Sequence, residues 1–282
     1  MTQPTKTRPT FGDRLVAAGA ERGRLCVGID PHPHLLKAWG LSVDVDGLRT
    51  FTLRCVEAFA DTAAVVKPQV AFFERFGSRG FAVLEEALAA LREQGCLSLA
   101  DAKRGDIGST MAGYAQAWLG EESPLRADAV TVSPYLGVGA LSPVFDLAKE
   151  TGGGVFVLAA TSNPEAVALQ SLSVDGRSVA QRVVDELAER NASAGGSNAS
   201  VGALGVVVGA TLGTPPVLDH LNGPVLLPGV GAQGATPADV RQLTSAAPHL
   251  GFANVSRAIL AAGPDVSELR KSVVDTASKF RD

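Results

Sequence analysis

Short apolar runs alternate with longer amphipathic stretches along most of this chain of 282 residues. Apolar runs rich in β-branched residues are typical of strands that are buried on both faces of a parallel sheet. The stretches between them repeat with the period of a helix, and in residues 81–93 the side chains of Leu84, Leu88 and Leu91 share one apolar face. Strands are predicted at residues 25–29, 63–67, 96–100, 129–132, 155–159, 204–208, 225–227 and 251–255.

Eight strand and helix units within about 250 residues fit a (β/α)8 TIM barrel, in which all strands are parallel. An open, doubly wound sheet is the alternative, since it shows the same alternation of strands and helices. Further helices are predicted at residues 10–20, 48–60, 179–190 and 238–246.

No stretch of linker-like composition divides the chain, so we expect a single domain over residues 1–282. Within it, residues 1–20 are expected to form an N-terminal extension and a helix that packs beneath the barrel. Residues 191–200 are rich in Gly, Ser and Asn and are expected to form a flexible surface loop.

The composition excludes several classes of partner. The net charge is −4 and aromatic residues make up 5% of the chain, so no basic, aromatic surface for nucleic acid is expected. The apolar run at residues 201–210 is too short to span a membrane, and residues 1–14 lack the apolar core of a signal peptide. Cys26, Cys55 and Cys96 form no CxxC motif and lie in apolar stretches, which is typical of buried thiols in a reducing compartment. We therefore expect a cytoplasmic protein.

Charged residues follow two of the predicted strands directly. Asp101 and Lys103 come at the end of the strand at 96–100, and they share one face because side chains alternate along a strand. Lys67 ends the strand at 63–67. Charges at the ends of buried strands are costly unless they are paired. They therefore indicate either a structural salt-bridge network or a site in which a lysine donates a proton beside a fixed carboxylate.

Other strand ends carry residues suited to binding a small anion. Active sites of TIM barrels form at the C-terminal ends of the strands, and the last two strands often supply a phosphate site. Here the seventh strand runs into the glycine-rich residues 229–234, which contain Gln233 and Gly234, and the eighth runs into Arg257. Glycines let backbone N–H groups approach an anion, and arginine offers a fork of donors. Glycine turns are common, so the loop alone would be a weak signal.

Asp106 and Thr110 lie four residues apart, on one face of a helix that is expected to start near Ile107. In the plainer interpretation Asp106 caps this helix and Thr110 lies on the surface. Glu74 is interpreted as a charge at the start of a helix.

Together these residues resemble the orotidine 5′-phosphate decarboxylase family, in its longer bacterial subgroup. The family signature D-x-K-x-x-D-I is met by Asp101, Lys103, Asp106 and Ile107, and the match continues to Thr110. The segment K-P-Q-V-A-F-F-E at 67–74 is similar to the family's second-strand segment. The resemblance extends over residues 24–260. Extra residues at both termini and around 191–200 have no counterpart in compact members.

The resemblance implies decarboxylation of orotidine 5′-monophosphate to uridine 5′-monophosphate and CO2, in de novo pyrimidine biosynthesis. It implies four catalytic residues: Lys103 as the acid that protonates C6, Asp101 against the departing carboxylate, Lys67 between Asp101 and a ribose hydroxyl, and Asp106. No metal and no organic cofactor is implied.

The resemblance also assigns residues to the rest of the substrate. Asp30 would hold the ribose and Ser162 the pyrimidine edge. Gln233, Gly234 and Arg257 would hold the 5′-phosphate, far from the reacting carbon, where binding energy can be used to stabilise the transition state.

A shared site follows from the same comparison. Asp106 and Thr110 would enter the neighbouring subunit's site, so the resemblance implies a homodimer.

Three rival functions remain open at this stage. Metal-dependent decarboxylases and aldolases with the same D-x-K-x-x-D pattern carry a carboxylate at the second-strand end, where this chain has Lys67, whose charge would repel Mg²⁺. A nucleotide-binding barrel without activity would need only Gln233 and Arg257. A thiol enzyme using Cys96 or Cys26 lacks a base at a suitable spacing.

Overall fold

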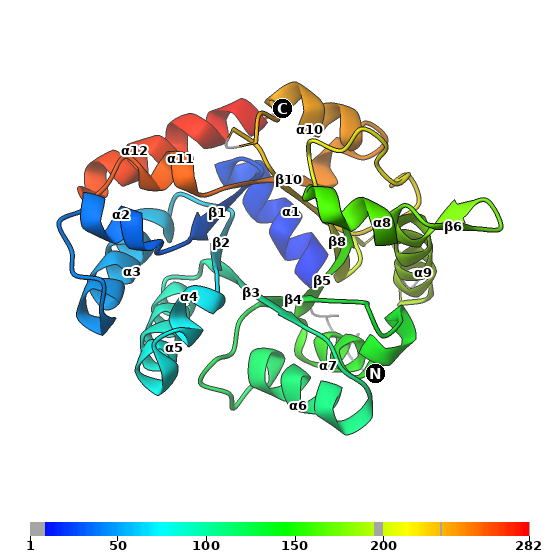
Figure 1. Cartoon of the computed structure of the whole chain (residues 1–282), viewed down its shortest axis with the longest axis horizontal. Helices are drawn as coiled ribbons and strands as arrows, with labels where there is room; N and C mark the ends of the chain where they lie inside the picture. The colour runs from blue at the N-terminus through cyan, green and yellow to red at the C-terminus, as the bar shows by residue number, and fades with distance from the viewer. Residues whose placement is uncertain (1–8, 195–199, 232, 282) are drawn as a thin grey trace, which may run out of the picture.

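The computed structural model describes residues 9–194, 200–231 and 233–281. Eight parallel strands close into a barrel in the order β1-β10-β9-β8-β5-β4-β3-β2 (Figure 1). The predicted TIM barrel is therefore confirmed, and the open-sheet alternative is wrong. The barrel strands are β1 (Leu25–Ile29), β2 (Val65–Pro68), β3 (Leu97–Arg104), β4 (Ala129–Val132), β5 (Gly154–Ala160), β8 (Leu204–Val208), β9 (Val225–Pro228) and β10 (Gly251–Val255).

Helices lie between the strands and surround the barrel (Figure 1). In the described part of the chain none of them combines the length and the apolar character that crossing a membrane requires. The helices are α1 (Phe11–Arg22), α2 (Pro33–Ala38), α3 (Val45–Phe59), α4 (Ala71–Glu74), α5 (Gly77–Glu93), α6 (Gly108–Leu119), α7 (Ser142–Thr151), α8 (Val167–Gln170), α9 (Val179–Ala194), α10 (Pro237–Leu243), α11 (Arg257–Leu260) and α12 (Val266–Ala277).

Helix α1 closes the N-terminal end of the barrel. It begins with a capping box, in which Thr10 and Asp13 bond each other's backbone N–H groups. Arg14 Nη1 forms an ion pair with Asp128 Oδ1 at 2.8 Å, and Thr10 Oγ1 donates to Val201 O at 2.5 Å. Asp128 and Val201 lie just before β4 and β8, so α1 is attached to the N-terminal side of the strands and leaves their C-terminal ends open.

The barrel interior is filled by one apolar cluster beneath the strand ends. Phe11 of α1 is fully buried there, and its ring meets Phe156 edge to face with centroids 6.0 Å apart. Gly154 makes room for it, because a Cβ at this position would lie 2.3 Å from Phe11 Cδ1. The cluster consists of Phe11, Leu15, Cys26, Ala64, Val65, Leu99, Ala129, Phe156, Val207, Leu226 and Phe252.

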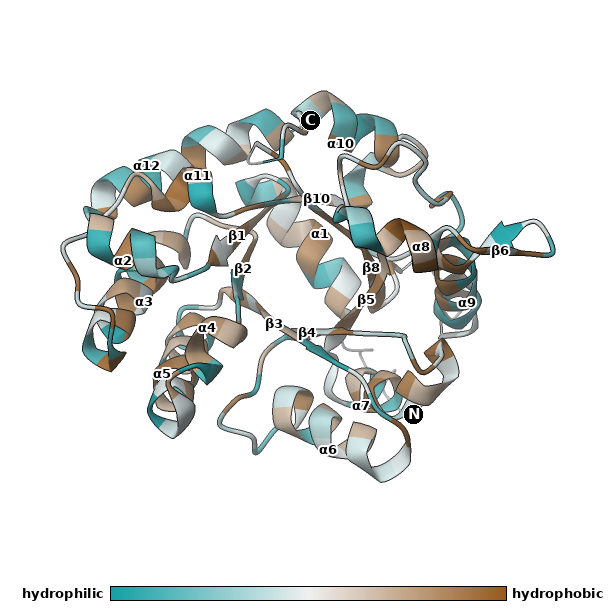
Figure 2. Ribbon diagram, viewed as in Figure 1, coloured by the Kyte–Doolittle hydropathy of each residue, from teal (hydrophilic) through white to brown (hydrophobic). Residues whose placement is uncertain are grey.

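The character of the barrel interior changes one layer higher. Because inward-facing positions recur every second residue, the next ones after this apolar cluster include Gly28, Lys67, Asp101, Thr131 and Asn254. The hydropathy colouring shows the surrounding helices with apolar faces toward the barrel (Figure 2). Polar side chains thus enter the barrel at the C-terminal ends of its strands.

Some boundaries differ from the predictions. Strand β3 continues four residues beyond position 100, through its charged residues to Arg104. Helix α9 extends to Ala194, so the loop predicted from residue 191 is wrong at its start, and residues 195–199 lie outside the described residues. Asn191 is buried and bonds Leu204 N, Leu204 O and Leu221 O, which ties α9 to β8. A small antiparallel hairpin, β6 (Ser173–Val174) with β7 (Arg177–Ser178), was not predicted.

We expect the substitution Phe11→Ala to lower the free energy of unfolding by about 3–5 kcal/mol, because it leaves a cavity where α1 meets the barrel interior. Urea denaturation at pH 7 measures this. Val274→Ala on exposed α12 is the control and should cost much less. Equal losses in the two variants would contradict the role given to α1.

Candidate active site

The carboxylate of Asp101 lies at the centre of a buried polar cluster at the C-terminal end of β3. Lys67 Nζ and Gln69 Nε2 each donate to Asp101 Oδ2 at 2.8 Å. Lys103 Nζ donates to Oδ1 at 2.6 Å and Thr131 Oγ1 at 2.9 Å. Asp101 and Lys67 are buried, whereas the Lys103 side chain is 45% exposed. We call Lys67, Asp101 and Lys103 the charge array.

The charge array holds its buried members in their ionised forms. Burial raises the pKa of Asp101, but the ammonium groups of Lys67 and Lys103 outweigh it and hold this pKa well below its usual range. For Lys67 burial acts in the opposite direction and lowers the pKa. The carboxylates of Asp101 and Asp30 outweigh burial, so the pKa of Lys67 is raised above its ordinary value. Asp101 and Lys67 therefore stay charged at neutral pH. The array can act as a fixed electrostatic field above the apolar interior.

The backbone of β3 is distorted where it carries Lys103. Ala100 lies opposite Val130 and Arg104 opposite Val132, so β3 holds two more residues than β4 across this interval. Lys103 adopts φ +49°, a left-handed conformation that costs a non-glycine residue about 1–3 kcal/mol. Its N–H donates to Thr131 Oγ1 at 2.9 Å instead of to a strand carbonyl. Such strain at a functional lysine is typical of active sites.

Next to the charge array, the ends of β1 and β10 offer buried oxygen atoms. Asp30 Oδ2, Asn254 Oδ1 and Ser256 Oγ have no hydrogen-bond partner within the described residues. A Cβ at Gly28 would lie 2.3 Å from Asp30 Oδ2 and 3.1 Å from Ser256 Oγ, so these two oxygens border the same small space. Buried polar atoms without a protein partner are available to a ligand or to water.

The glycine-rich loop after β9 is held together by hydrogen bonds within the loop. Gly229, Gly231 and Gly234 have positive φ, as glycine allows. However, the N–H groups of Gln233 and Gly234 donate to Gly229 O and Gly231 O within the loop. In this conformation both N–H groups are bonded within the loop, and their contact with an anion stays a prediction. The Gln233 side chain instead accepts a hydrogen bond from Ser162 Oγ at 2.7 Å, which joins the loops after β5 and β9.

Arg257 is the first residue of α11, directly after β10, and its side chain is exposed. Strand β10 pairs with β1, so Arg257 lies on the side of the barrel where β1 ends. Burial is the main cause that lowers the pKa of His32 after β1; Asp30 opposes it, and His34 and Arg257 add to it. His32 also packs edge to face on Phe72 at 4.4 Å. The structure thus places Arg257 at the β1 side of the barrel's C-terminal end.

Asp106 and Thr110 lie outside the charge array. Helix α6 begins at Gly108 with Ile107 as its N-cap, so the interpretation of Asp106 as a helix cap is wrong. Asp106 Oδ1 accepts a hydrogen bond from the N–H of Ile107 at 2.7 Å, and Thr110 is exposed. Neither residue is among the side chains that bond the Asp101 carboxylate of their own chain.

Sequence analysis missed several polar residues of this region. Thr131 is the one polar residue of the apolar run 129–132 and could have been found by this signal. Asn254 and Ser256 follow the same inward alternation as Phe252. Glu74 lies in the first turn of the four-residue helix α4, as interpreted, and it also forms an ion pair with Arg104 that the sequence did not reveal.

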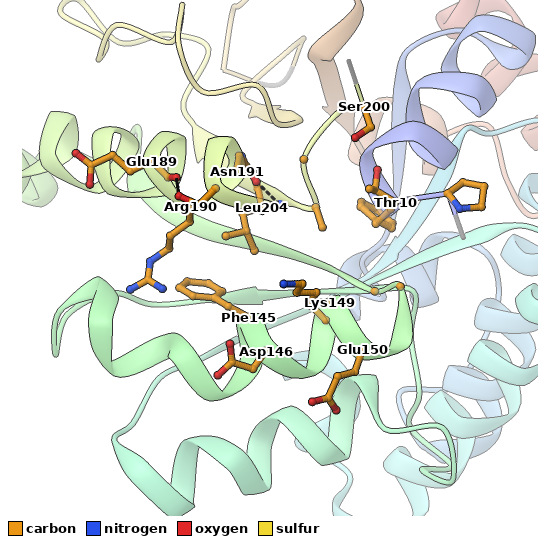
Figure 3. A pocket seen from close by; sticks show the side chains of 18 of the residues that line it. Thr10, Phe145, Asp146, Lys149, Glu150, Glu189, Arg190, Asn191, Ser200 and Leu204 are labelled. Atoms are coloured by element: carbon orange, nitrogen blue, oxygen red, sulfur yellow. Dashed lines mark hydrogen bonds between the residues drawn. The ribbon is translucent and has the colours of Figure 1, made fainter. Parts of the chain in front are cut away.

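A spacious cavity lies elsewhere, at the N-terminal end of the barrel. It measures about 630 Å³ and lies between α7, α9 and the start of α1, with Thr10, Phe145, Lys149 and Arg190 among its lining residues (Figure 3). No member of the charge array lines it. We assign it no part in the chemistry.

The thiols are unsuited to catalysis. Burial raises the pKa of Cys26 and of Cys96 to about 12, and that of Cys55 well above its ordinary value. The thiolate is the nucleophilic form, so these cysteines are inert at neutral pH. Within residues 9–194, 200–231 and 233–281, no group of three or more His, Cys, Asp or Glu side chains could hold a metal ion.

The geometry, a charge array at the mouth of a TIM barrel, agrees with what sequence comparison finds. The family model described as orotidine 5′-phosphate decarboxylase / HUMPS family matches residues 23–272. The chain belongs to this family. It is 63% identical over 272 residues to an orotidine 5′-phosphate decarboxylase from Corynebacterium efficiens, covering 96% of this chain and 97% of the relative. A relative of the same name from Salinispora arenicola is 59% identical over 263 residues, 93% of each chain.

Solved structures of the family share the fold. A crystal structure of a Streptomyces avermitilis protein is 51% identical with a TM-score of 0.91, covering 99% of this chain and 98% of that one. The Leishmania donovani OMP decarboxylase is 30% identical with a TM-score of 0.76, covering 96% and 99%. Family membership thus extends over nearly the whole barrel.

Proposed function

We propose that this protein decarboxylates orotidine 5′-monophosphate to uridine 5′-monophosphate and CO2, as a step of pyrimidine nucleotide synthesis. The observation that carries the proposal is the charge array, in which a buried carboxylate is held ionised between two lysines at the open end of the barrel. Neither a nucleotide-binding scaffold nor a metal-dependent relative accounts for this arrangement. The names of the relatives in the family support the same reaction.

In the proposed reaction, the bond between C6 of the pyrimidine and its carboxylate breaks, and the bonding electron pair stays on C6. Lys103 Nζ then transfers a proton to C6, and the neutral amine regains a proton from water. Asp101 lies beside the departing carboxylate, where its fixed negative charge disfavours the substrate relative to the CO2-like transition state. Lys103 suits the role of acid because its ammonium group is partly exposed and contacts Asp101 at 2.6 Å.

The remaining substrate-binding residues are proposed from the resemblance to the family. Asp30, which has an unpartnered buried oxygen, would hold the ribose together with Lys67. Ser162 would contact the pyrimidine edge, and Gln233, Gly234 and Arg257 would bind the 5′-phosphate. The hydrogen bond between Ser162 and Gln233 supports the placement of base and phosphate on neighbouring loops.

We further propose a homodimer in which Asp106 and Thr110 enter the partner's site. Exposed apolar side chains lie close to them. Ile107 adjoins Asp106, and Tyr135 and Leu136 follow Ser133, whose N–H donates to Arg104 O at 2.7 Å. The exposed fractions of Ile107, Tyr135 and Leu136 are 62%, 78% and 54%. Apolar patches of this kind mark protein interfaces. The chain itself is proposed to be one domain, and a cytoplasmic location fits its three buried, free thiols.

Loss of orotidine 5′-monophosphate absorbance, on addition of EDTA-treated protein, tests the reaction. We expect conversion to uridine 5′-monophosphate without added metal. The substitution Lys103→Ala should abolish turnover, because the proton donor is lost, and leave the Kd for uridine 5′-monophosphate within about tenfold, since that Kd depends mainly on the remote phosphate contacts. Absence of turnover in the wild-type protein, with recovery on a sugar phosphate plus Mg²⁺, would contradict the proposal.

Mixing two inactive variants tests the shared site. Chains with Asp106→Asn and chains with Lys103→Ala should regain part of the activity when combined, because a hybrid dimer contains one site with both residues intact. Size exclusion and mass spectrometry would verify that heterodimers form. Heterodimers without activity would show that each subunit's site is self-contained.

A further inference from the structure

The peptide group between Ala102 and Lys103 is held by side chains at both ends. Its N–H, that of Lys103, donates to Thr131 Oγ1 at 2.9 Å. Its carbonyl, that of Ala102, accepts from Arg104 Nη1 at 3.0 Å. Strand pairing is displaced here by the bulge in β3, so these two side chains replace the hydrogen bonds that a regular strand would supply.

This peptide sets the direction of the Lys103 side chain. Lys103, Asp175 and Asn222 are the non-glycine residues with positive φ in the described chain, and of these Lys103 alone lies within a barrel strand. A left-handed residue persists only where its surroundings over-determine it. If φ of Lys103 returned to the negative values that are ordinary for non-glycine residues, its Cα–Cβ bond would turn relative to the strand and carry Nζ away from Asp101.

Arg104 is itself fixed by two neighbouring elements. Its guanidinium forms an ion pair with Glu74 at the end of α4. It also lies 5.7 Å from the ring centroids of Tyr114 and Trp118 on α6, at cation–π distance. The Arg104 side chain is 23% exposed, so this contact is better shielded than a surface ion pair.

Glu74, which pairs with Arg104, is connected to the charge array through the end of β2. Helix α4 follows directly on the segment that contains Lys67 and Gln69, and Gln69 Nε2 donates to Asp101 Oδ2 at 2.8 Å. The backbone of this segment also binds β3, through Val70 N to Asp101 O at 3.4 Å. One guanidinium therefore links the segment that carries Lys67 to the peptide that carries Lys103.

We propose that Arg104 and Glu74 are a positioning pair, which aligns Lys103 Nζ for proton transfer by holding the 102–103 peptide in its strained conformation. The inference rests on the proposed function for its kinetic consequence. Neither residue reaches the reacting carbon, so their effect passes through Lys103. The pair should therefore act on kcat and not on binding of the nucleotide.

The test compares Arg104→Met, Glu74→Gln and the double variant. A misplacement of about 1 Å can cost about 100-fold in rate, so we expect kcat of Arg104→Met to fall by about this factor, with the Kd for uridine 5′-monophosphate unchanged. The kcat of Glu74→Gln should fall by a smaller factor, because the glutamine can still form a neutral hydrogen bond with Arg104. The double variant should be no slower than Arg104→Met, since the two residues act as one unit.

The exposed ion pair between Arg49 and Glu86, on α3 and α5, supplies matched controls. Arg49→Met and Glu86→Gln should leave kcat at the wild-type value. An unchanged kcat in Arg104→Met, or a parallel loss of nucleotide binding, would overturn the positioning role.

Crystal structures of Arg104→Met and Glu74→Gln test the positioning of Lys103 directly, whether or not the proposed reaction is correct. If the wild-type protein fails to decarboxylate orotidine 5′-monophosphate, the function is wrong, and the structures still decide the geometry. We expect the 102–103 peptide to rotate and the contact between Lys103 Nζ and Asp101 to be lost in Arg104→Met. Retention of the left-handed Lys103 and of that contact would overturn the pair's role.

Discussion

The buried carboxylate of Asp101, bonded by four side chains, is the interaction on which the rest of the site depends. An ionised group away from water is tolerated only when it is paired and its oxygen atoms are satisfied, and removing one partner of such a pair is strongly destabilising. Lys67 and Gln69 come from the end of β2, Thr131 from β4, and Lys103 from β3 itself. The carboxylate therefore requires three neighbouring strands to end at matching heights.

The N-terminal end of the barrel contributes stability, and the C-terminal end carries the candidate active site. At the N-terminal end α1 and the apolar interior supply stability, with Phe11 inserted where Gly154 has no side chain. At the C-terminal end the inward positions become polar, and unpartnered oxygens and a strained lysine remain. This division lets the site keep costly features, such as the left-handed Lys103, because the apolar interior beneath it compensates for their free energy.

The sequence predicts those parts of the fold that depend on local pattern. Strands β1, β4, β8 and β10 begin and end where their apolar runs do, because both faces of each are buried. The charged end of β3 has no such pattern, since its strand conformation depends on partners more than thirty residues away, such as Lys67. Arg104 and Glu74 lie 30 residues apart in the chain, so no local pattern predicts their contact either. The internal hydrogen bonds of the loop at 229–234 were also beyond prediction, because glycine spacing does not determine where N–H groups point.

Ionisation of Asp101 is the central claim, and a carbon-13 NMR titration of its carboxyl group, assigned with Asp101→Asn, tests it most directly. A depressed pKa means that this carboxylate stabilises the fold above its ordinary pKa of 3.8, and that the contribution is lost as the pH falls below that value. We predict that Asp101 is still ionised at pH values where ordinary aspartates are protonated, for as long as the protein stays folded. A titration midpoint at or above 3.8 in the folded protein would contradict the account.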